Sequence, residues 1–132
     1  MDEIYKEEII KHYKNPKNKK KINEKECECY KEDYNPFCGD RVKICLKIKN
    51  KKIEKIFFDG EGCVISQFSA SVLSEKLKNK NIEEIIKIEK RDLLKMLGIK
   101  KITIARIKCA MLPLVAIKKA IIEYISKNKN LI

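Results

Sequence analysis

Six cysteines are the residues of this chain best suited to do chemistry, because thiolates are both nucleophiles and soft metal ligands. No two of them form a Cys-x-x-Cys pair, which argues against a zinc ribbon or a thioredoxin-like motif. Residues 1–5 lack the basic and apolar regions of a signal peptide, so we expect a cytoplasmic protein that uses thiolates rather than a disulfide framework. Any metal that the cysteines share must be held by distant segments. The six are Cys27, Cys29, Cys38, Cys45, Cys63 and Cys109.

Three of the cysteines stand where a turn or a helix is expected to begin. Cys38 lies in a turn that contains proline and glycine, Cys63 follows a glycine-flanked turn, and Cys109 is expected at the start of the last helix. A helix N-terminus carries partial positive charge, which stabilises a thiolate. Asp40 adds an oxygen that can complete a four-coordinate site. We therefore expect nucleophiles or metal ligands here; the alternative is three small buried side chains in turns.

Alternating apolar and charged residues predict the strands. The clearest alternation covers residues 41–49 and places Cys45 on the polar face, with no evident partner. A turn over 50–52 and a return strand over 53–59 follow, while a weaker alternation indicates a strand over 25–34. These segments predict a three-stranded antiparallel sheet with one face exposed to water.

Helical periodicity describes most of the remaining chain. Proline is tolerated in the first turn of a helix, so Pro113 places the start of the last helix close to Cys109. Strands followed by helices indicate an α+β fold with helices packed on one face of the sheet. A length of 132 residues fits one domain, over 1–132. The expected helices cover residues 2–14 (before the sheet), 64–78, 82–88, 91–97 and about 109–127.

The formal net charge of +12 does not indicate a nucleic-acid partner. The lysines are spread along the whole chain, tryptophan is absent, and arginine occurs only at Arg41, Arg91 and Arg106. Phosphate recognition usually uses the arginine fork and aromatic stacking, so a solvated basic surface is the expected role of this charge. No apolar run approaches the ~20 residues of a membrane span, so we expect no membrane partner.

Four short motifs, spread over nearly the whole chain, form a recognisable series. They are Lys11-His12-Tyr13-Lys14-Asn15-Pro16, Asn35-Pro36-Phe37-Cys38-Gly39-Asp40, Gly60-Glu61-Gly62-Cys63 and Arg106-Ile107-Lys108-Cys109. Together they resemble the IscU/SufU/NifU-N-terminal family of iron–sulfur cluster assembly scaffolds and sulfur acceptors. The resemblance implies a scaffold that receives sulfur from a cysteine desulfurase, assembles a [2Fe–2S] cluster and transfers it to apo acceptor proteins. The alternative that it implies is a zinc-dependent sulfur acceptor, formally a sulfurtransferase, that activates the desulfurase.

The resemblance also implies a ligand set. Residues matching Cys38, Asp40, Cys63 and Cys109 hold Zn²⁺ in the SufU type, and the three cysteines with their neighbours hold a nascent iron–sulfur cluster in the IscU type. Asp40 is the one hard ligand among soft ones, so we interpret it as the exchangeable position. Cys38 is our candidate for the acceptor of persulfide sulfur, and zinc would keep its thiol deprotonated for that reaction.

The subtype stays open because the chain combines features of both. Lys108 precedes the last cysteine, as in the SufU type, where the IscU type has histidine. The spacing between Cys63 and Cys109 resembles the shorter, IscU-type spacing. Residues 102–106 replace the Leu-Pro-Pro-Val-Lys stretch that a dedicated chaperone binds in the IscU type. The scaffold is therefore the first hypothesis, which makes the protein a binding protein rather than an enzyme, and the sulfurtransferase is the second.

The other candidates have weaker functional interpretations. His12, the only histidine, is expected to be a packing or surface residue, and Arg106 an exposed one. Cys27 and Cys29 are expected on the same face of a strand, where they are too far apart for an easy mutual disulfide. We expect them to be core or adventitious thiols; the alternative is a pair of weak metal ligands. Lys108 is either a solvated lysine or one that tunes the last thiolate electrostatically.

Overall fold

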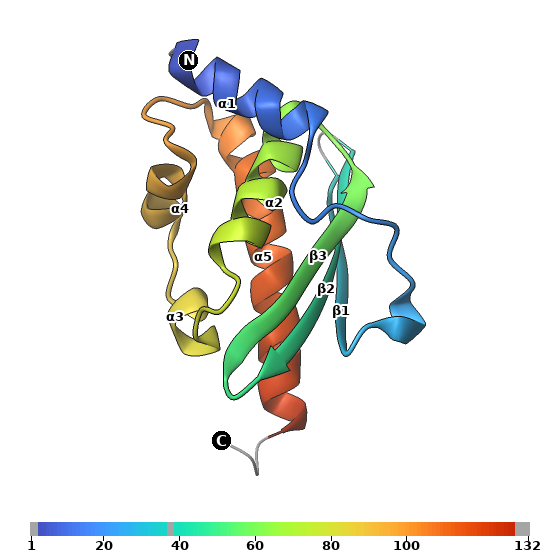
Figure 1. Cartoon of the computed structure of the whole chain (residues 1–132). Coiled ribbons are helices and arrows are strands. Elements are labelled where there is room, and N and C mark those ends of the chain that lie inside the picture. Colours follow the sequence, from blue (N-terminus) through green and yellow to red (C-terminus); the bar gives the residue numbers. More distant parts are fainter. Residues whose placement is uncertain (1–2, 37–38, 129–132) are drawn as a thin grey trace.

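The computed structural model describes residues 3–36 and 39–128 of the chain (Figure 1). In these ranges one α-helix precedes the sheet and further α-helices follow it, as the sequence predicts. The described elements are α1 (Glu3–Lys14), the short 3₁₀ helix η1 (Glu24–Glu26), β1 (Cys29–Asn35), β2 (Asp40–Lys49), β3 (Lys52–Glu61), α2 (Val64–Lys76), α3 (Ile82–Ile86), α4 (Lys90–Leu97) and α5 (Ile104–Lys127). No helix in the described ranges is long and apolar enough to cross a membrane.

The sheet is antiparallel, in the order β1-β2-β3. Alternate residues of β2 are buried, which confirms the face assigned from the sequence and leaves Cys45 on the opposite, outer face. Asn50 and Lys51 both have positive φ angles, of 53° and 62°, which suits the tight two-residue turn between β2 and β3. β1 begins at Cys29, four residues later than the weak alternation suggested, and this shift changes the assignment of Cys27.

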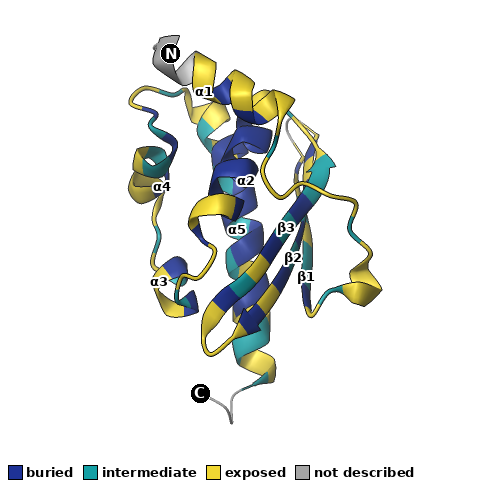
Figure 2. Cartoon of the chain, viewed as in Figure 1, coloured by how far each residue is buried: buried dark blue, intermediate teal, exposed yellow. Residues whose placement is uncertain are grey.

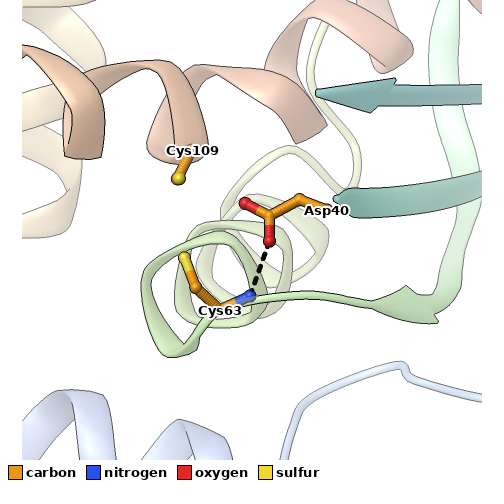
Figure 3. Close-up of side chains that lie close together, drawn as sticks. All are labelled: Asp40, Cys63 and Cys109. Carbon is orange, nitrogen blue, oxygen red and sulfur yellow. Dashed lines mark hydrogen bonds between the residues drawn. The ribbon is translucent and has the colours of Figure 1, made fainter. Parts of the chain in front are cut away.

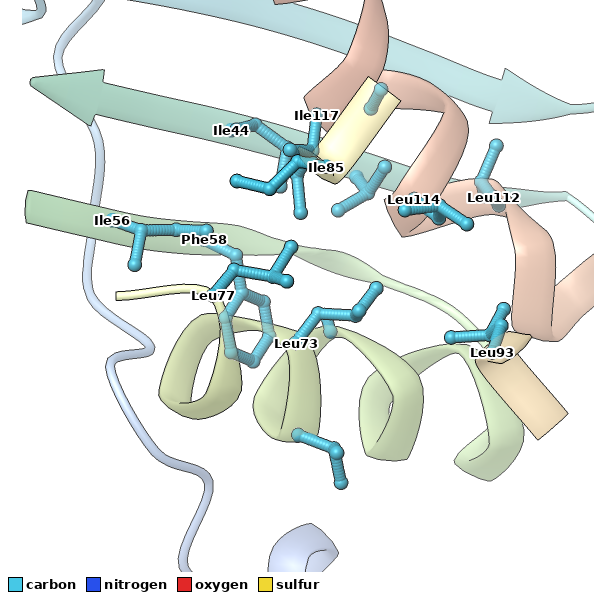
Figure 4. Packing of buried hydrophobic residues seen from close by; sticks show 14 of the residues in the cluster. Ile44, Ile56, Phe58, Leu73, Leu77, Ile85, Leu93, Leu112, Leu114 and Ile117 are labelled. Carbon is cyan, nitrogen blue, oxygen red and sulfur yellow. The ribbon is translucent and has the colours of Figure 1, made fainter. Parts of the chain in front are cut away.

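In the described part of the chain, α2 and α5 pack on the same face of the sheet, which confirms the predicted α+β arrangement (Figure 1). α5 packs against β1 and β2, whereas α2 packs against β3 and α5. Figure 2 shows that most of α2 is buried, that the middle of α5 is buried whereas residues at both of its ends are exposed, and that α1 is mostly exposed. In the core, Phe58 of β3 meets Leu73 and Leu77 of α2, and Leu114 and Ile117 of α5 lie beside the sheet (Figure 4).

The start of α5 contradicts the prediction drawn from proline. α5 begins at Ile104, where the Thr103 hydroxyl accepts the N–H of Arg106, so Pro113 lies in the interior of the helix. An interior proline costs about 3 kcal/mol, but each fully buried Leu or Ile contributes roughly 1.5–3 kcal/mol. α5 buries several apolar side chains, including Leu114 and Ile117, so burial outweighs the lost hydrogen bond. Ile122 of the same helix is 53% exposed although its side chain is apolar.

His12 of α1 contacts Ser71 and Phe68 of α2. Its Nδ1 lies 2.6 Å from the Ser71 hydroxyl oxygen, which also accepts the Lys17 N–H at 2.7 Å. The hydroxyl therefore has its own proton left to donate to a neutral imidazole. The ring also meets Phe68 edge-on, with the centroids 5.3 Å apart. His12 is thus a packing residue, one of the two roles expected for it.

Acidification is expected to loosen α1. Burial lowers the pKa of His12 below its ordinary value of 6.5, so the docked state favours the neutral ring. The stability that this docking contributes is present above pH 6.5 and is lost as the pH falls through the lowered folded-state pKa. Hydrogen exchange of the α1 amides, corrected for intrinsic rates, should show weaker protection at pH 5 than at pH 7. His12→Asn cannot titrate there, and an unchanged pH dependence in that variant would contradict the assignment.

Candidate metal centre

Two thiols and one carboxylate from three separate segments meet at one end of the sheet (Figure 3). Asp40 is the first residue of β2, Cys63 immediately precedes α2, and Cys109 lies in the second turn of α5. One ligand atom from each lies within 4.8 Å of the other two. Zinc–sulfur and zinc–oxygen bonds of roughly 2.0–2.3 Å place tetrahedral ligand atoms about 3.5–4 Å apart, so small side-chain rotations suffice to bind one metal ion. The arrangement suits a metal that takes mixed sulfur and oxygen ligands.

Asp40 is held in place by the backbone of the second ligand. Its carboxylate is 1% exposed, and its Oδ1 accepts the N–H of Cys63 at 2.7 Å. The hydrogen bond ties the start of β2 to the start of α2 and so sets the spacing of the two ligands. A buried carboxylate needs such partners, because burial without them disfavours the charged form.

Cys63 is the N-cap residue of α2, as the sequence predicts. Its carbonyl oxygen accepts the Ser66 hydroxyl at 3.0 Å and the Gln67 N–H at 3.1 Å, which closes the first helical turn. The thiol therefore lies at the positive end of the helix dipole. Cys109 is 5% exposed and lies beyond the first turn of α5, so its predicted position at the helix N-terminus is wrong.

A cavity of about 490 Å³ opens beside the two sulfur atoms. Arg106 and Lys108 line it and are exposed, so the entrance carries positive charge. Ile104 also lines it and is 79% exposed. Lys108 thus lies on the same wall as Cys109 and is exposed to solvent, which fits both roles expected for it. Asn35, at the end of β1, completes the wall beside Cys63.

The structure brings together three of the four predicted ligands: Asp40, Cys63 and Cys109. Cys38 lies outside the described residues, so both its place as the fourth ligand and its role as persulfide acceptor stay predictions. Sequence reasoning found Cys63 from a glycine-flanked turn and Asp40 as a carboxylate close to a cysteine, whereas it selected Cys109 for a helix start that the structure places at Ile104.

Two predictions about the remaining cysteines are wrong. Cys27 and Cys45 form a disulfide, with their Cα atoms 5.5 Å apart, although Cys45 had no evident partner in the sequence. Cys27 and Cys29 do not share a strand face, because β1 begins only at Cys29, and Cys29 faces the core opposite Leu46. Burial raises the pKa of the Cys29 thiol to about 11. The missing signal was the register of β1 on β2, which brings the start of β1 beside Cys45.

Gly62 leaves the space in which the Asp40 carboxylate sits. A Cβ atom at Gly62 would lie 2.8 Å from Asp40 Oδ1 and 2.6 Å from Ser66 Oγ, closer than real contacts allow. We expect Gly62→Ala to displace the carboxylate and to weaken zinc binding by roughly 10- to 100-fold, which is the usual effect of removing a residue that positions a metal ligand. Competition with a zinc chelator measures the affinity. Ser66→Ala is the control, because it removes only a helix-start contact; if it weakens binding equally, the effect belongs to the helix start rather than to Asp40.

Comparisons with known proteins show the family to which the chain belongs. The sequence matches the family described as "NifU-like N terminal domain" over residues 4–131. It is 33% identical to the zinc-dependent sulfurtransferase SufU of Bacillus subtilis over 92% of this chain and 91% of that protein. It is 32% identical to the iron–sulfur cluster assembly scaffold protein IscU 1 of Archaeoglobus fulgidus, over 95% and 79% of the two chains. A solved SUF-system scaffold protein from Fervidobacterium islandicum superposes with a TM-score of 0.70 at 25% identity, over 90% of this chain and 97% of that one.

Proposed function

Because the chain belongs to the NifU-like N-terminal domain family of iron–sulfur cluster assembly scaffolds, we propose that it assembles a [2Fe–2S] cluster and hands it on. In this proposal a cysteine desulfurase supplies the sulfur, and apo iron–sulfur proteins in the cytoplasm receive the cluster. One observation carries the proposal: two thiols and a carboxylate from three distant segments converge within 4.8 Å.

The donor set fits a cargo that must be both held and released. Thiolates of Cys63 and Cys109 bind iron or zinc strongly, whereas a single carboxylate is the weaker and more labile ligand for such metals. Asp40 Oδ1 already accepts the Cys63 N–H, so the carboxylate keeps a partner when its bond to the cargo breaks. Asp40 is therefore the exchangeable ligand in this proposal.

Sulfur would enter through Cys38. Its thiolate attacks the outer sulfur of a persulfide on the desulfurase, the sulfur–sulfur bond of the donor breaks, and the donor cysteine leaves as a thiolate. A small dithiol then reduces the persulfide on Cys38: the dithiol becomes a disulfide, Cys38 regains its thiol, and the sulfide that is released enters the cluster. Exposed Arg106 and Lys108, on the cavity wall, offer positive charge to an acidic surface of the partner.

The second candidate is a zinc-dependent sulfur acceptor. The 33% identity to a zinc-dependent sulfurtransferase and the lysine at position 108 favour it. Asp40, Cys63 and Cys109, with Cys38 as the predicted fourth, would hold the zinc ion. When bound, zinc supplies positive charge that keeps cysteine thiols deprotonated.

Metal content decides between the two candidates. The protein is purified without oxygen, and its zinc, iron and acid-labile sulfide are measured together with its visible spectrum. Iron and sulfide in equal amounts, with a brown chromophore, support the scaffold. About one zinc ion per chain without sulfide, together with stimulation of a desulfurase, supports the sulfur acceptor and overturns the scaffold. Neither metal in folded protein overturns both.

A further inference from the structure

The disulfide lies well away from the candidate metal centre. Cys45 is five residues along β2 from Asp40, which is about 17 Å at the rise of an extended strand. Its side chain is on the outer face of the sheet, whereas the three candidate ligands meet at one end of the sheet. Cys27 and Cys45 are therefore a second pair of thiols, separate from those that the proposed function uses.

The chain between α1 and β1 must cross the sheet. Lys20 donates its N–H to the Phe58 carbonyl, and the Phe58 N–H donates to the Asn18 carbonyl, so residues 18–20 run beside β3. β1 lies at the opposite edge of the sheet. Residues 20–28 cross on the outer face, opposite the face on which α2 and α5 pack, and there Lys20 Nζ lies 3.9 Å from the centre of the Phe57 ring (Figure 1).

The second half of this crossing, around η1, makes few buried contacts with the sheet. None of the residues of η1 is buried, and its backbone hydrogen bonds are local: the Glu26 N–H donates to the Asn23 carbonyl and the Cys27 N–H donates to the Glu24 carbonyl. Beneath the crossing lies a cavity of about 390 Å³, with Phe57 and both disulfide cysteines in its wall. The covalent bond from Cys27 to Cys45 is thus a principal attachment of η1 to the sheet.

We propose that Cys27 and Cys45 are a redox-active pair whose oxidation fastens the crossing segment, residues 20–28, to the outer face of the sheet. The oxidant is a low-molecular-weight disulfide of the glutathione type. One protein thiolate attacks it and releases one small thiol, and the second protein thiolate then attacks the mixed disulfide and releases the other. Two protein thiols and one small disulfide thus give one protein disulfide and two small thiols. Reduction by excess small thiol reverses both exchanges and releases the segment.

Local charge assigns the first attack to Cys45. It lies on β2 between Lys43 and Lys47, and Lys55 lines the same cavity, so positive charge favours its thiolate. Cys27 lies between Glu26 and Glu28, whose charges oppose ionisation. Cys29 is no competitor, because its thiol is buried on the core side of the sheet.

Peptide mapping tests the pair directly. The full-length protein is reduced, incubated with oxidised glutathione, alkylated and cleaved with trypsin. We expect peptide 44–47 linked to peptide 26–31, with fragmentation placing the link on Cys27. Cys29→Ser should retain the link and Cys27→Ser should lose it. Cys27→Ser should also form a mixed disulfide with glutathione faster than Cys45→Ser. Full alkylation of both cysteines after oxidation, or a link to Cys29, would overturn the proposal.

Hydrogen exchange tests the consequence for the segment. Amides of residues 21–28 should exchange at least tenfold more slowly in the oxidised than in the reduced protein, because the bond restricts opening of the segment. Cys27→Ser should exchange like the reduced protein under both conditions. Equal rates in the two states would overturn the fastening role even if the disulfide forms. Zinc and iron contents of the same samples report on the proposed function independently.

Discussion

Replacing Cys109 by serine is expected to lower the affinity of the chain for zinc by at least about a hundredfold. Loss of residues that merely support a ligand costs roughly 10- to 100-fold in metal affinity, so loss of a ligand itself reaches the upper end or more. A serine hydroxyl stays protonated at neutral pH and is a poor substitute for a thiolate. Zinc affinity is measured by competition with a chromophoric chelator on reduced protein.

Cys29→Ser is the matched control for this substitution. Cys29 and Cys109 are both buried, so each variant places a hydroxyl where a thiol was packed and carries a similar cost in stability. Only Cys109 lies within 4.8 Å of the other candidate ligand atoms. Circular dichroism confirms that both variants are folded before zinc is added. If Cys29→Ser lost zinc as strongly as Cys109→Ser, the metal centre would have to be assigned elsewhere.

Phe58→Ala is expected to destabilise the fold by about 3–5 kcal/mol, as for other buried phenylalanines. Phe58 is 0% exposed and fills the space between β3 and α2, beside Leu73 and Leu77 (Figure 4). Domains have total stabilities of roughly 5–15 kcal/mol, so this loss removes a large share. Urea unfolding followed by circular dichroism gives the free energy of unfolding.

The neighbouring Phe57 supplies the control, since the two phenylalanines point to opposite faces of β3. Phe57 is half-buried on the outer face, where it meets the Lys20 ammonium group. Phe57→Ala should lose the cation–π contact, worth about 0.5–1 kcal/mol, and a part of the burial, so its total loss should stay below half of that of Phe58→Ala. Equal losses would mean that the outer face contributes as much to stability as the core.

The two most accurate predictions from the sequence concern local geometry. Alternation over residues 41–49 identified the buried face of β2, because side chains on a strand point to opposite faces in turn. The glycine-flanked turn before Cys63 identified the start of α2, because a change of period marks the boundary between elements. Cys63 was found in this way, whereas Asp40 was selected as a carboxylate close to Cys38, and the hydrogen bond between Asp40 and Cys63 then holds the two together.

Three features depend on contacts between distant segments and were decided only by the tertiary structure. Local rules placed the start of α5 near Cys109, but burial against the sheet and α2 makes an interior Pro113 tolerable. The pairing of Cys27 with Cys45 needs both the register that places Tyr30 opposite Cys45 and the turn after η1 that brings Cys27 to this strand, and no pattern within either segment contains these contacts. The packing of His12 likewise needs Ser71 from α2.

The physical distinction is between short-range and long-range terms of the energy. Residue spacing records which side of a helix or strand is apolar, so the sequence by itself determined the elements and most of their buried faces. The convergence of Asp40, Cys63 and Cys109 within 4.8 Å required β2, α2 and α5 to pack against one another. Packing of elements sums many small contacts between residues far apart in the chain, and only the folded structure shows which of those contacts are made together.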